Sequence, residues 1–367
     1  MDFIDLKSQY NAYKEEIQSA VFEVMDSCQF IMGPRHEQFE QALSAYVGSK
    51  YALGCSSGTD ALLLALMALE IQPGDEVITT PFTFIATAEV IAFLGAKPVF
   101  VDIDARDFNI DPSRIEAAIT PKTRAIMPVS LYGQCADMDP INAIAKAHNL
   151  AVIEDGCQSF GATYKQKRSG NLCLIGTTSF FPSKPLGGYG DGGAIFTSDE
   201  QVANRVSALR NHGQSARYEH GFIGINGRLD AIQAAILQVK LRHFDEELVR
   251  REQRRQRYDQ ALAQSAVTVP SLLEGRTSVC AQYSIRSRDR DGLAEHLKRA
   301  GIPTAVHYPK PLHLQPAFED LGYKRGDFPV SEQASAEVLS LPFSPFLSEA
   351  DQDRVVEAVL SHKEDRC

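Results

Sequence analysis

The chain has 367 residues, and its 47 Asp and Glu outnumber its 37 Lys and Arg, giving a formal net charge of −10. This acidic balance excludes a general affinity for nucleic acid or for an anionic membrane surface. The longest apolar run, residues 61–69, is too short to span a bilayer, and the first ten residues lack the apolar core of a signal peptide. We therefore expect a soluble chain with about two domains and no nucleic-acid or membrane partner.

The seven cysteines are scattered and contain no CxxC pair. Such spacing predicts reduced thiols in a cytoplasmic protein, with neither a zinc site nor a disulfide framework. They stand at positions 28, 55, 135, 157, 173, 280 and 367.

The first 60 residues predict two helices and then an anion-binding turn. Residues 8–47 form the helices, broken at Gly33-Pro34, and residues 51–54 form a short strand. The small-residue turn 56–59 and an apolar helix from Asp60 follow. Free amide groups and the helix dipole meet at such a turn, so it can bind a phosphate. An ordinary N-cap uses the same residue types and stays an alternative. The turn fits neither common nucleotide-binding glycine motif.

From residue 74 onward, short strands alternate with helices. This order predicts an α/β fold with a mainly parallel sheet covered by helices on both faces. Ligands bind such sheets at the carboxyl ends of the strands. The turn at 57–59, the aromatic loop after Thr80 and Asp155 all follow strands. The expected strands are 76–79, 97–101, 124–129, 151–154 and 194–197, and the expected helices are 84–94, 139–149 and 199–210.

Asp155 follows a run that reads as a buried strand, so its carboxylate needs a cationic or proton-donating partner. A helix cap and a magnesium ligand are the alternatives. Glu154 and Asp155 point to opposite faces of an extended strand, which argues against a paired acid and base.

Lys184 precedes a loop with five glycines in seven positions, 187–193. A lysine in such an apolar, close-packed setting is poorly hydrated, so its pKa falls and its amine becomes a nucleophile. The alternative is a surface lysine beside a glycine-rich hairpin.

The remaining chain predicts a second, smaller α+β domain. A polar loop precedes an apolar helix from Asp230, and Asn226 and Arg228 in that loop can face a ligand or another subunit. From Phe244 the helix becomes highly charged, which places the domains at 1–243 and 244–367. A strand at 279–285 and helices at 290–300 and 348–360 follow. His307 and His313 are spaced poorly for a metal, so the proline-rich loop around them predicts polar contacts or a plain turn.

One cofactor needs a lysine nucleophile, a buried carboxylate, an anion site and a flat apolar wall together. Pyridoxal 5′-phosphate (PLP) joins its aldehyde to a desolvated lysine, and a carboxylate keeps its ring nitrogen protonated. Its phosphate needs a helix N-terminus and hydroxyl groups. The candidates are Lys184, Asp155, Phe84 for the ring, and Gly58, Thr59 and Ser179 for the phosphate.

The chain resembles the DegT family of nucleotide-sugar aminotransferases over nearly its whole length. The matching stretches are SSGTDAL, DEVITTPFTFIATAEV, VIEDGCQSFGA, SFFPSKPLGGYGDGG and GINGRLDAIQAA. The resemblance implies the aspartate-aminotransferase fold (fold type I), PLP as cofactor, and a homodimer with shared active sites.

It also implies residue roles. Lys184 would be the Schiff-base lysine and proton shuttle, Asp155 would hold the pyridine nitrogen, and Phe84 would stack on the ring. Gln158 would contact the cofactor near its ring oxygen. Gly58, Thr59 and Ser179 would bind the phosphate, which Asn226 would reach from the neighbouring subunit.

Within this family the chain looks most similar to enzymes that aminate UDP-2-acetamido-2-deoxy-3-oxo-glucuronic acid with glutamate, for surface polysaccharide biosynthesis. Arg228, His307 and Tyr308 match the residues suited to the sugar carboxylate; an ion pair of Arg228 with Asp230 or another nearby acid is the alternative.

The chain departs from the family pattern at EDGCQ, where EDAAQ is commoner, and Cys157 would therefore lie near the cofactor. The alternatives are an aminotransferase for a 4-keto or another 3-keto sugar, and a sugar dehydratase of the same fold, which Lys184 disfavours. A PLP-binding regulator would need a DNA-binding segment or a missing lysine, and a nicotinamide enzyme would need its glycine fingerprint.

Overall fold

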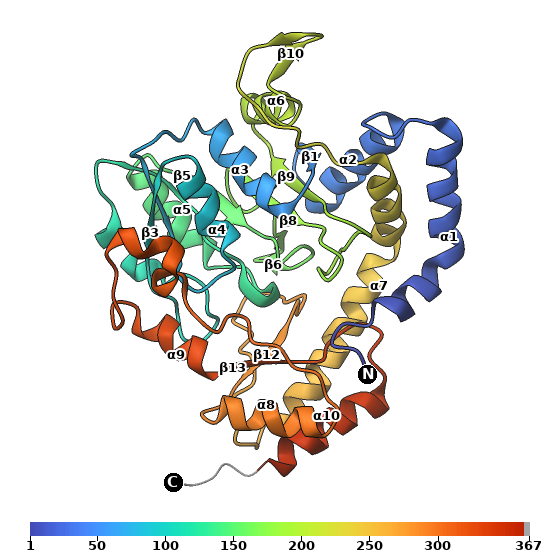
Figure 1. Cartoon of the computed structure of the whole chain (residues 1–367), viewed down its shortest axis with the longest axis vertical. Helices are drawn as coiled ribbons and strands as arrows, with labels where there is room; N and C mark the ends of the chain where they lie inside the picture. Colours follow the sequence, from blue (N-terminus) through green and yellow to red (C-terminus); the bar gives the residue numbers. More distant parts are fainter. Residues whose placement is uncertain (363–367) are drawn as a thin grey trace.

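A seven-stranded sheet forms the centre of the computed structural model, which describes residues 1–362 (Figure 1). All its neighbouring strands are parallel except that β9 runs antiparallel to both β1 and β8. The prediction of a mainly parallel α/β sheet is confirmed. Its strands, in spatial order, are β1 (Tyr51–Cys55), β9 (Gly193–Thr197), β8 (Ile175–Ser179), β5 (Ala151–Asp155), β4 (Thr123–Ile126), β2 (Glu76–Thr79) and β3 (Lys97–Phe100).

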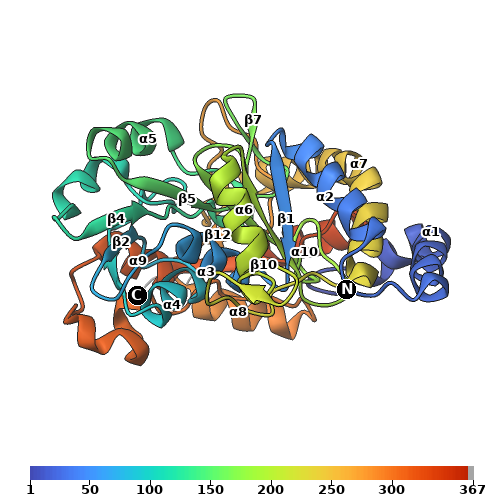
Figure 2. The same cartoon turned by 90° about the horizontal axis from the view of Figure 1, so that it is seen from above.

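Helices cover the sheet, and a long helix leads away from it to a smaller unit (Figures 1 and 2). The helices of the sheet layer are α2 (Pro34–Val47), α3 (Gly58–Ala68), α4 (Ala86–Phe93), α5 (Met138–Ala147) and α6 (Glu200–Leu209). The long helices α1 (Leu6–Ser27) and α7 (Ala231–Leu262) lie side by side at one edge of the molecule.

The smaller unit carries the two-stranded sheet β12–β13 and the last helices. Its elements are β12 (Tyr283–Arg286), α8 (Arg290–Arg299), α9 (Pro329–Glu337), β13 (Val338–Leu341) and α10 (Glu349–Ser361). The hairpins are β6 (Thr163–Tyr164) with β7 (Lys167–Arg168) and β10 (Gln214–Ala216) with β11 (Glu219–His220); the short 3-10 helices are η1 (Pro112–Arg114), η2 (Glu116–Ala118), η3 (Leu131–Gly133), η4 (Leu312–Leu314) and η5 (Pro316–Leu321).

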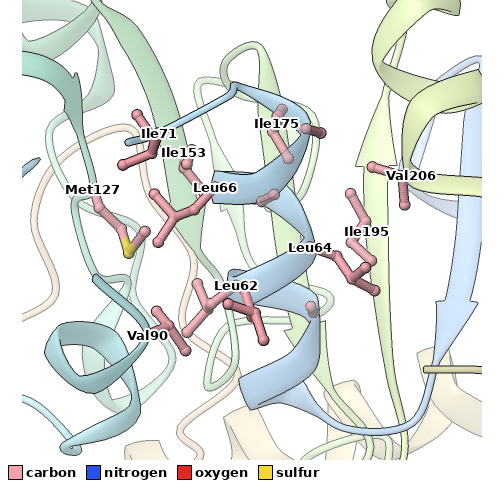
Figure 3. Close-up of a cluster of buried hydrophobic side chains, with 14 of the residues drawn as sticks. Leu62, Leu64, Leu66, Ile71, Val90, Met127, Ile153, Ile175, Ile195 and Val206 are labelled. Atoms are coloured by element: carbon pink, nitrogen blue, oxygen red, sulfur yellow. The ribbon is translucent and has the colours of Figure 1, made fainter. Parts of the chain in front are cut away.

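Helix α3 is fixed to the sheet by burial of most of its side chains. Figure 3 shows Leu64 and Leu66 of α3 beside Ile195 and Ile153 of the sheet, and Leu62 beside Val90 of α4. Apolar packing of this extent holds a helix in one place, because each buried leucine contributes about 1.5–3 kcal/mol. The N-terminus of α3 is therefore a fixed point at the carboxyl end of β1.

Three of the differences from the sequence-based expectation concern elements next to cavity residues. Strand β8 was not expected, because IGTTS has small polar residues instead of an apolar run, yet all five residues are buried. Phe84 precedes α4, which begins at Ala86, instead of lying inside it. The strand expected at 279–285 covers only Tyr283–Arg286, since its earlier residues bond to the loop at 132–133.

Helix α7 is one continuous helix of 32 residues and passes position 244 without a break. Its first half packs in the cluster with Leu237 and Phe244, and its end supplies Tyr258 and Leu262 to the core of the smaller unit. One helix thus belongs to both cores. The domain boundary at 243/244 stays a prediction.

Candidate active site

A cavity of about 460 Å³ opens at the carboxyl ends of the central strands. Its walls come from the turn before α3, the loop and helix around α4, the ends of β5 and β8, and the segment 307–308 of the smaller unit. The structure thus brings together residues that are far apart in the chain. The predicted site residues that line the cavity are Gly58, Thr59, Phe84, Asp155, Gln158, Ser179, Lys184, His307 and Tyr308.

One end of the cavity is the N-terminus of α3. Ser57 caps this helix, and its hydroxyl accepts a 3.0 Å hydrogen bond from the amide of Asp60. The ordinary N-cap is therefore present, but it does not use the first two amides of the helix, those of Gly58 and Thr59, which line the cavity. Such unpaired amides can bind an anion.

Gly58 permits a close approach between α3 and β8. A Cβ atom at this position would lie 2.6 Å from the Cβ of Ser179 and 3.0 Å from the Sγ of Cys157. Because Gly58 has no side chain, the Ser179 hydroxyl can lie beside the helix N-terminus. Hydroxyl and amide donors therefore converge on one point.

Lys184 lines the same cavity and is half-buried, with its backbone amide donating to the Phe181 carbonyl over 2.8 Å. Burial lowers the pKa of its amine, and the neighbouring Cys157 and Asp155 oppose this shift only in part. A lowered pKa increases the neutral fraction of the amine near neutral pH, which is the form that acts as a nucleophile.

Asp155 ends β5 and is buried. Its Oδ2 accepts a 2.7 Å hydrogen bond from the hydroxyl of Thr87, and its Oδ1 accepts one of 3.2 Å from the amide of Cys157. Within residues 1–362 it has no ion-pair partner. The carboxylate is thus oriented by neutral donors while its face toward the cavity stays available to a cation. Glu154 points the other way, to Ser130 and Ser169, as expected.

Gln158 joins the two walls of the cavity. Its Oε1 accepts a 2.8 Å hydrogen bond from the amide of Tyr132, and its Nε2 donates to the Tyr308 hydroxyl over 3.2 Å. The Tyr132 hydroxyl in turn donates to the His307 carbonyl. The segment with His307 and Tyr308 is therefore bonded directly to the sheet side of the site.

Burial changes the protonation of this segment. It lowers the pKa of His307, with a smaller contribution from the positive charge of Lys184, and it raises the pKa of the Tyr308 hydroxyl. Both side chains are thus neutral hydrogen-bonding groups near pH 7. The ring of Phe84 lies 6.0 Å from that of Tyr308 and is 51% exposed, so an apolar face stands free at the cavity mouth.

Asn226 and Arg228 do not line this cavity. The backbone of Asn226 bridges to Asn211, and Arg228 donates a 2.6 Å hydrogen bond from Nη1 to Asn211 Oδ1. Within residues 1–362, Arg228 forms no ion pair with Asp230 or any other acid. The loop that carries both residues also exposes Tyr218 and Ile223, at 82% and 91%.

Sequence reasoning missed several residues of the cavity. Thr87 orients Asp155, and the hydroxyls of Thr83 and Thr87 lie 3.0 Å apart. No sequence pattern marked this pair, because Thr83 lies in the loop before α4 and Thr87 lies within the helix. Ser183 and Gln282 also line the cavity, and no sequence pattern marked them. No helix within residues 1–362 is long and apolar enough to cross a membrane, and no cluster there of three or more His, Cys, Asp or Glu is arranged to hold a metal ion.

A buried carboxylate and a lysine of lowered pKa share this cavity with a helix N-terminus at the edge of a mainly parallel α/β sheet, as is typical of an aminotransferase of fold type I. The comparison with known families agrees. A model of the DegT/DnrJ/EryC1/StrS aminotransferase family matches residues 11–360. The chain belongs to this family, and the predicted fold and enzyme class are confirmed.

Two relatives and one solved structure illustrate how similar the chain is to known members of this family. The chain is 51% identical to the UDP-2-acetamido-2-deoxy-3-oxo-D-glucuronate aminotransferase of Pseudomonas aeruginosa, covering 95% of this chain and 97% of that one. It is 50% identical to a protein of Geobacillus stearothermophilus named a pleiotropic regulatory protein, covering 97% and 96%. The structure of NtdA from Bacillus subtilis with bound pyridoxamine phosphate is similar with a TM-score of 0.88 at 35% identity, covering 95% of this chain and 81% of that one.

Proposed function

We propose that this aminotransferase moves the amino group of glutamate to a keto nucleotide sugar, UDP-2-acetamido-2-deoxy-3-oxo-glucuronic acid. The observation that carries the proposal is the shared cavity: Lys184 and Asp155 lie in it together with His307 and Tyr308. The first pair suits transamination, and the second supplies directed hydrogen bonds to an oxygen-rich substrate. The relative that is 51% identical acts, by its name, on the 3-oxo-glucuronate sugar.

The residues present fit PLP. Asp155 is a buried carboxylate with no ion-pair partner within residues 1–362, so it is free to pair with the protonated ring nitrogen. Gly58 leaves open a space beside Ser179 that a Cβ atom would fill. A phosphate needs such an open space with amide and hydroxyl donors around it. Phe84 offers an exposed ring, and Lys184 an amine of lowered pKa. When bound, PLP supplies an electrophilic aldehyde and a ring that accepts electrons.

Each residue then has a defined task. Lys184 would attach the cofactor and, once free, would take the proton from the α-carbon of the donor. Asp155 would accept a hydrogen bond from the ring N–H. Gly58, Thr59 and Ser179 would bind the phosphate, Phe84 would stack on the ring, and Gln158 would contact the ring oxygen.

Asn226 and Arg228 would serve a neighbouring subunit's site in a homodimer. Their place outside the cavity of their own chain supports this, as does the exposure of Tyr218 and Ile223 on the same loop, because large exposed apolar side chains mark interfaces. Arg228 would then bind the sugar carboxylate with His307 and Tyr308. The shared sites can be tested by mixing inactive Lys184→Ala and Arg228→Ala subunits, which should restore activity.

The experiment that tests the function separates its two half-reactions. Purified enzyme loaded with PLP should lose its visible absorbance on addition of glutamate. It should recover the absorbance with UDP-2-acetamido-2-deoxy-3-oxo-glucuronic acid and release the amino sugar. A 4-keto sugar that reacts faster, or a dehydrated product, would support one of the alternatives. A cytoplasmic location stays a prediction from the reduced cysteines; of these, Cys367 lies outside the described residues.

A regulatory role is the second candidate, because one relative that is 50% identical is named a pleiotropic regulatory protein. The presence of Lys184 in the cavity favours turnover over regulation alone. Absence of product with every keto sugar, despite a normal glutamate half-reaction, would favour the regulator.

A further inference from the structure

Gln282 lies directly before β12 and lines the same cavity as Lys184, His307 and Tyr308. Its side-chain oxygen, Oε1, is buried and has no hydrogen-bond partner within residues 1–362. Buried polar atoms in folded proteins are almost always paired, and leaving one unpaired is costly. If the side-chain amide of Gln282 were rotated by 180°, its NH₂ group would take the place of Oε1 and would be unpaired instead. An unpaired group in the wall of a cavity indicates a partner that the polypeptide does not supply.

The backbone on both sides of Gln282 is anchored. The amide of Ala281 donates to the Tyr132 carbonyl over 2.9 Å, and that of Val279 donates to the Gly133 carbonyl over 3.0 Å. On the other side, Tyr283 is buried and donates from its hydroxyl to Asp259 over 2.8 Å. The backbone position of Gln282 beside the cavity is therefore fixed by the fold.

The strand that follows Gln282 is linked to the His307 side of the cavity. The Ser284 hydroxyl lies 2.8 Å from that of Ser340, which lies 2.9 Å from Nδ1 of His307. A short hydrogen-bonded chain thus ties β12, directly after Gln282, to His307, with which Gln282 shares the cavity.

We infer that Gln282 is a specificity-determining residue that accepts a hydrogen bond from a donor group on the sugar ring, a hydroxyl or the acetamido N–H. The carboxylates of glutamate are acceptors only, so they cannot satisfy an acceptor. The one donor of glutamate, its amino group, is the group that reacts and must lie at the cofactor. A keto sugar carries both kinds of group around the carbon that Lys184 must reach. Gln282 therefore recognises the amino acceptor and not the amino donor. This inference rests on the proposed function.

The test is Gln282→Met, which keeps the length of the side chain and removes its polar atoms. We expect transfer from the pyridoxamine form to UDP-2-acetamido-2-deoxy-3-oxo-glucuronic acid to slow ~10-fold, since a buried hydrogen bond is lost. The rate of the glutamate half-reaction should stay within about twofold of wild type. Independently of turnover, the Kd for the unreactive UDP-2-acetamido-2-deoxy-glucuronic acid, measured by calorimetry, should rise ~10-fold.

Gln352 provides a matched control. It is also buried with an unpaired Oε1, but it lies in α10 and does not line the cavity. Gln352→Met should leave both half-reactions and the sugar Kd unchanged. Equal rates and equal Kd in Gln282→Met and wild type would overturn the inference, and so would slowing of both half-reactions to the same degree. If wild type itself does not aminate this sugar, the proposed function fails instead, and the inference falls with it.

Discussion

The hydroxyl of Thr87 donates a 2.7 Å hydrogen bond to the carboxylate of Asp155, between two elements 68 residues apart in sequence. Thr87 lies in the first turn of α4, and Asp155 ends β5. The Thr83 hydroxyl, 3.0 Å from that of Thr87, completes a short chain that ends on the carboxylate. This arrangement fixes the direction in which Asp155 presents its free lone pairs to the cavity.

We predict that Thr87→Val weakens the affinity for PLP and lowers kcat/KM ~10-fold, because a hydrogen bond to a charged group contributes about 1.5–3 kcal/mol. Valine keeps the shape of threonine, so the packing of α4 should survive. Fluorescence titration with PLP and steady-state kinetics measure the two effects. Thr83→Val, which removes the outer hydroxyl only, should have a smaller effect. Equal effects of the two variants would contradict a direct role of Thr87.

Lys184→Ala should abolish turnover, by at least ~10³-fold, because the residue supplies both the covalent attachment and the proton transfer. Borohydride treatment of wild-type enzyme loaded with PLP, followed by peptide mapping, should label residue 184. Lys240 is an internal control: it is also buried with a lowered pKa, but its amine is bonded to the Gly187 carbonyl. Label on Lys240, or a Lys184→Ala enzyme with normal turnover, would refute the assignment.

Gly58→Ala should close the proposed phosphate site. The added methyl group would lie 2.6 Å from the Cβ of Ser179, and neither β8 nor α3 can shift easily because both are buried. We expect a loss of PLP affinity of ~10-fold or more, in line with the 1–3 kcal/mol that overpacking typically costs. Gly221→Ala is the control, since its Cβ would meet nothing closer than 3.5 Å. Unchanged affinity in Gly58→Ala would place the phosphate elsewhere.

The sequence predicted the parts of the site that depend on local chemistry. The turn before α3, the carboxylate after β5 and the lysine before the glycine loop each follow from residue type and spacing. Thr87 and Gln282 could not be found in this way, because their significance depends on tertiary contacts: one on a hydrogen bond to Asp155, the other on a wall that β12 shares with His307. Strand β8 was missed for a related reason, since its small polar residues are buried only by neighbours from elsewhere in the chain.

The length of α7 shows a second limit of prediction from sequence, which concerns where a helix ends. Its apolar first half and its charged second half predict different surroundings, and the change of composition at Phe244 suggested a boundary. The backbone stays helical, and arginines of the charged half pair within the helix and with the smaller unit, as Arg255 does with Glu252 and Arg257 does with Asp353. A change of composition therefore marks a change of neighbours here and not the end of an element.

The buried Lys240 gives a prediction about stability. Its amine bonds to the Gly187 carbonyl and lies 5.2 Å from the centre of the Tyr189 ring, with Glu247 and Arg251 as the charged neighbours on α7. Burial lowers its pKa from 10.5 to about 8, Glu247 opposes this shift, and Arg251 adds to it. The folded protein therefore binds this proton less tightly than the unfolded chain does.

The sign of the pH dependence follows from that difference. Between pH 8 and pH 10.5 the unfolded chain holds more protons at Lys240 than the folded protein does, so the free energy of unfolding rises with pH through this window. The rise is roughly 3 kcal/mol for a shift of this size. Lys240→Met lacks the titrating group, so its stability relative to wild type, measured by urea denaturation at fixed protein concentration, should fall by that amount from pH 8 to pH 10.5. If the free energy of unfolding of Lys240→Met relative to wild type stays constant with pH, Lys240 has an ordinary pKa. Its bond to the Gly187 carbonyl would then hold the glycine loop without a free-energy cost for burying the charged amine.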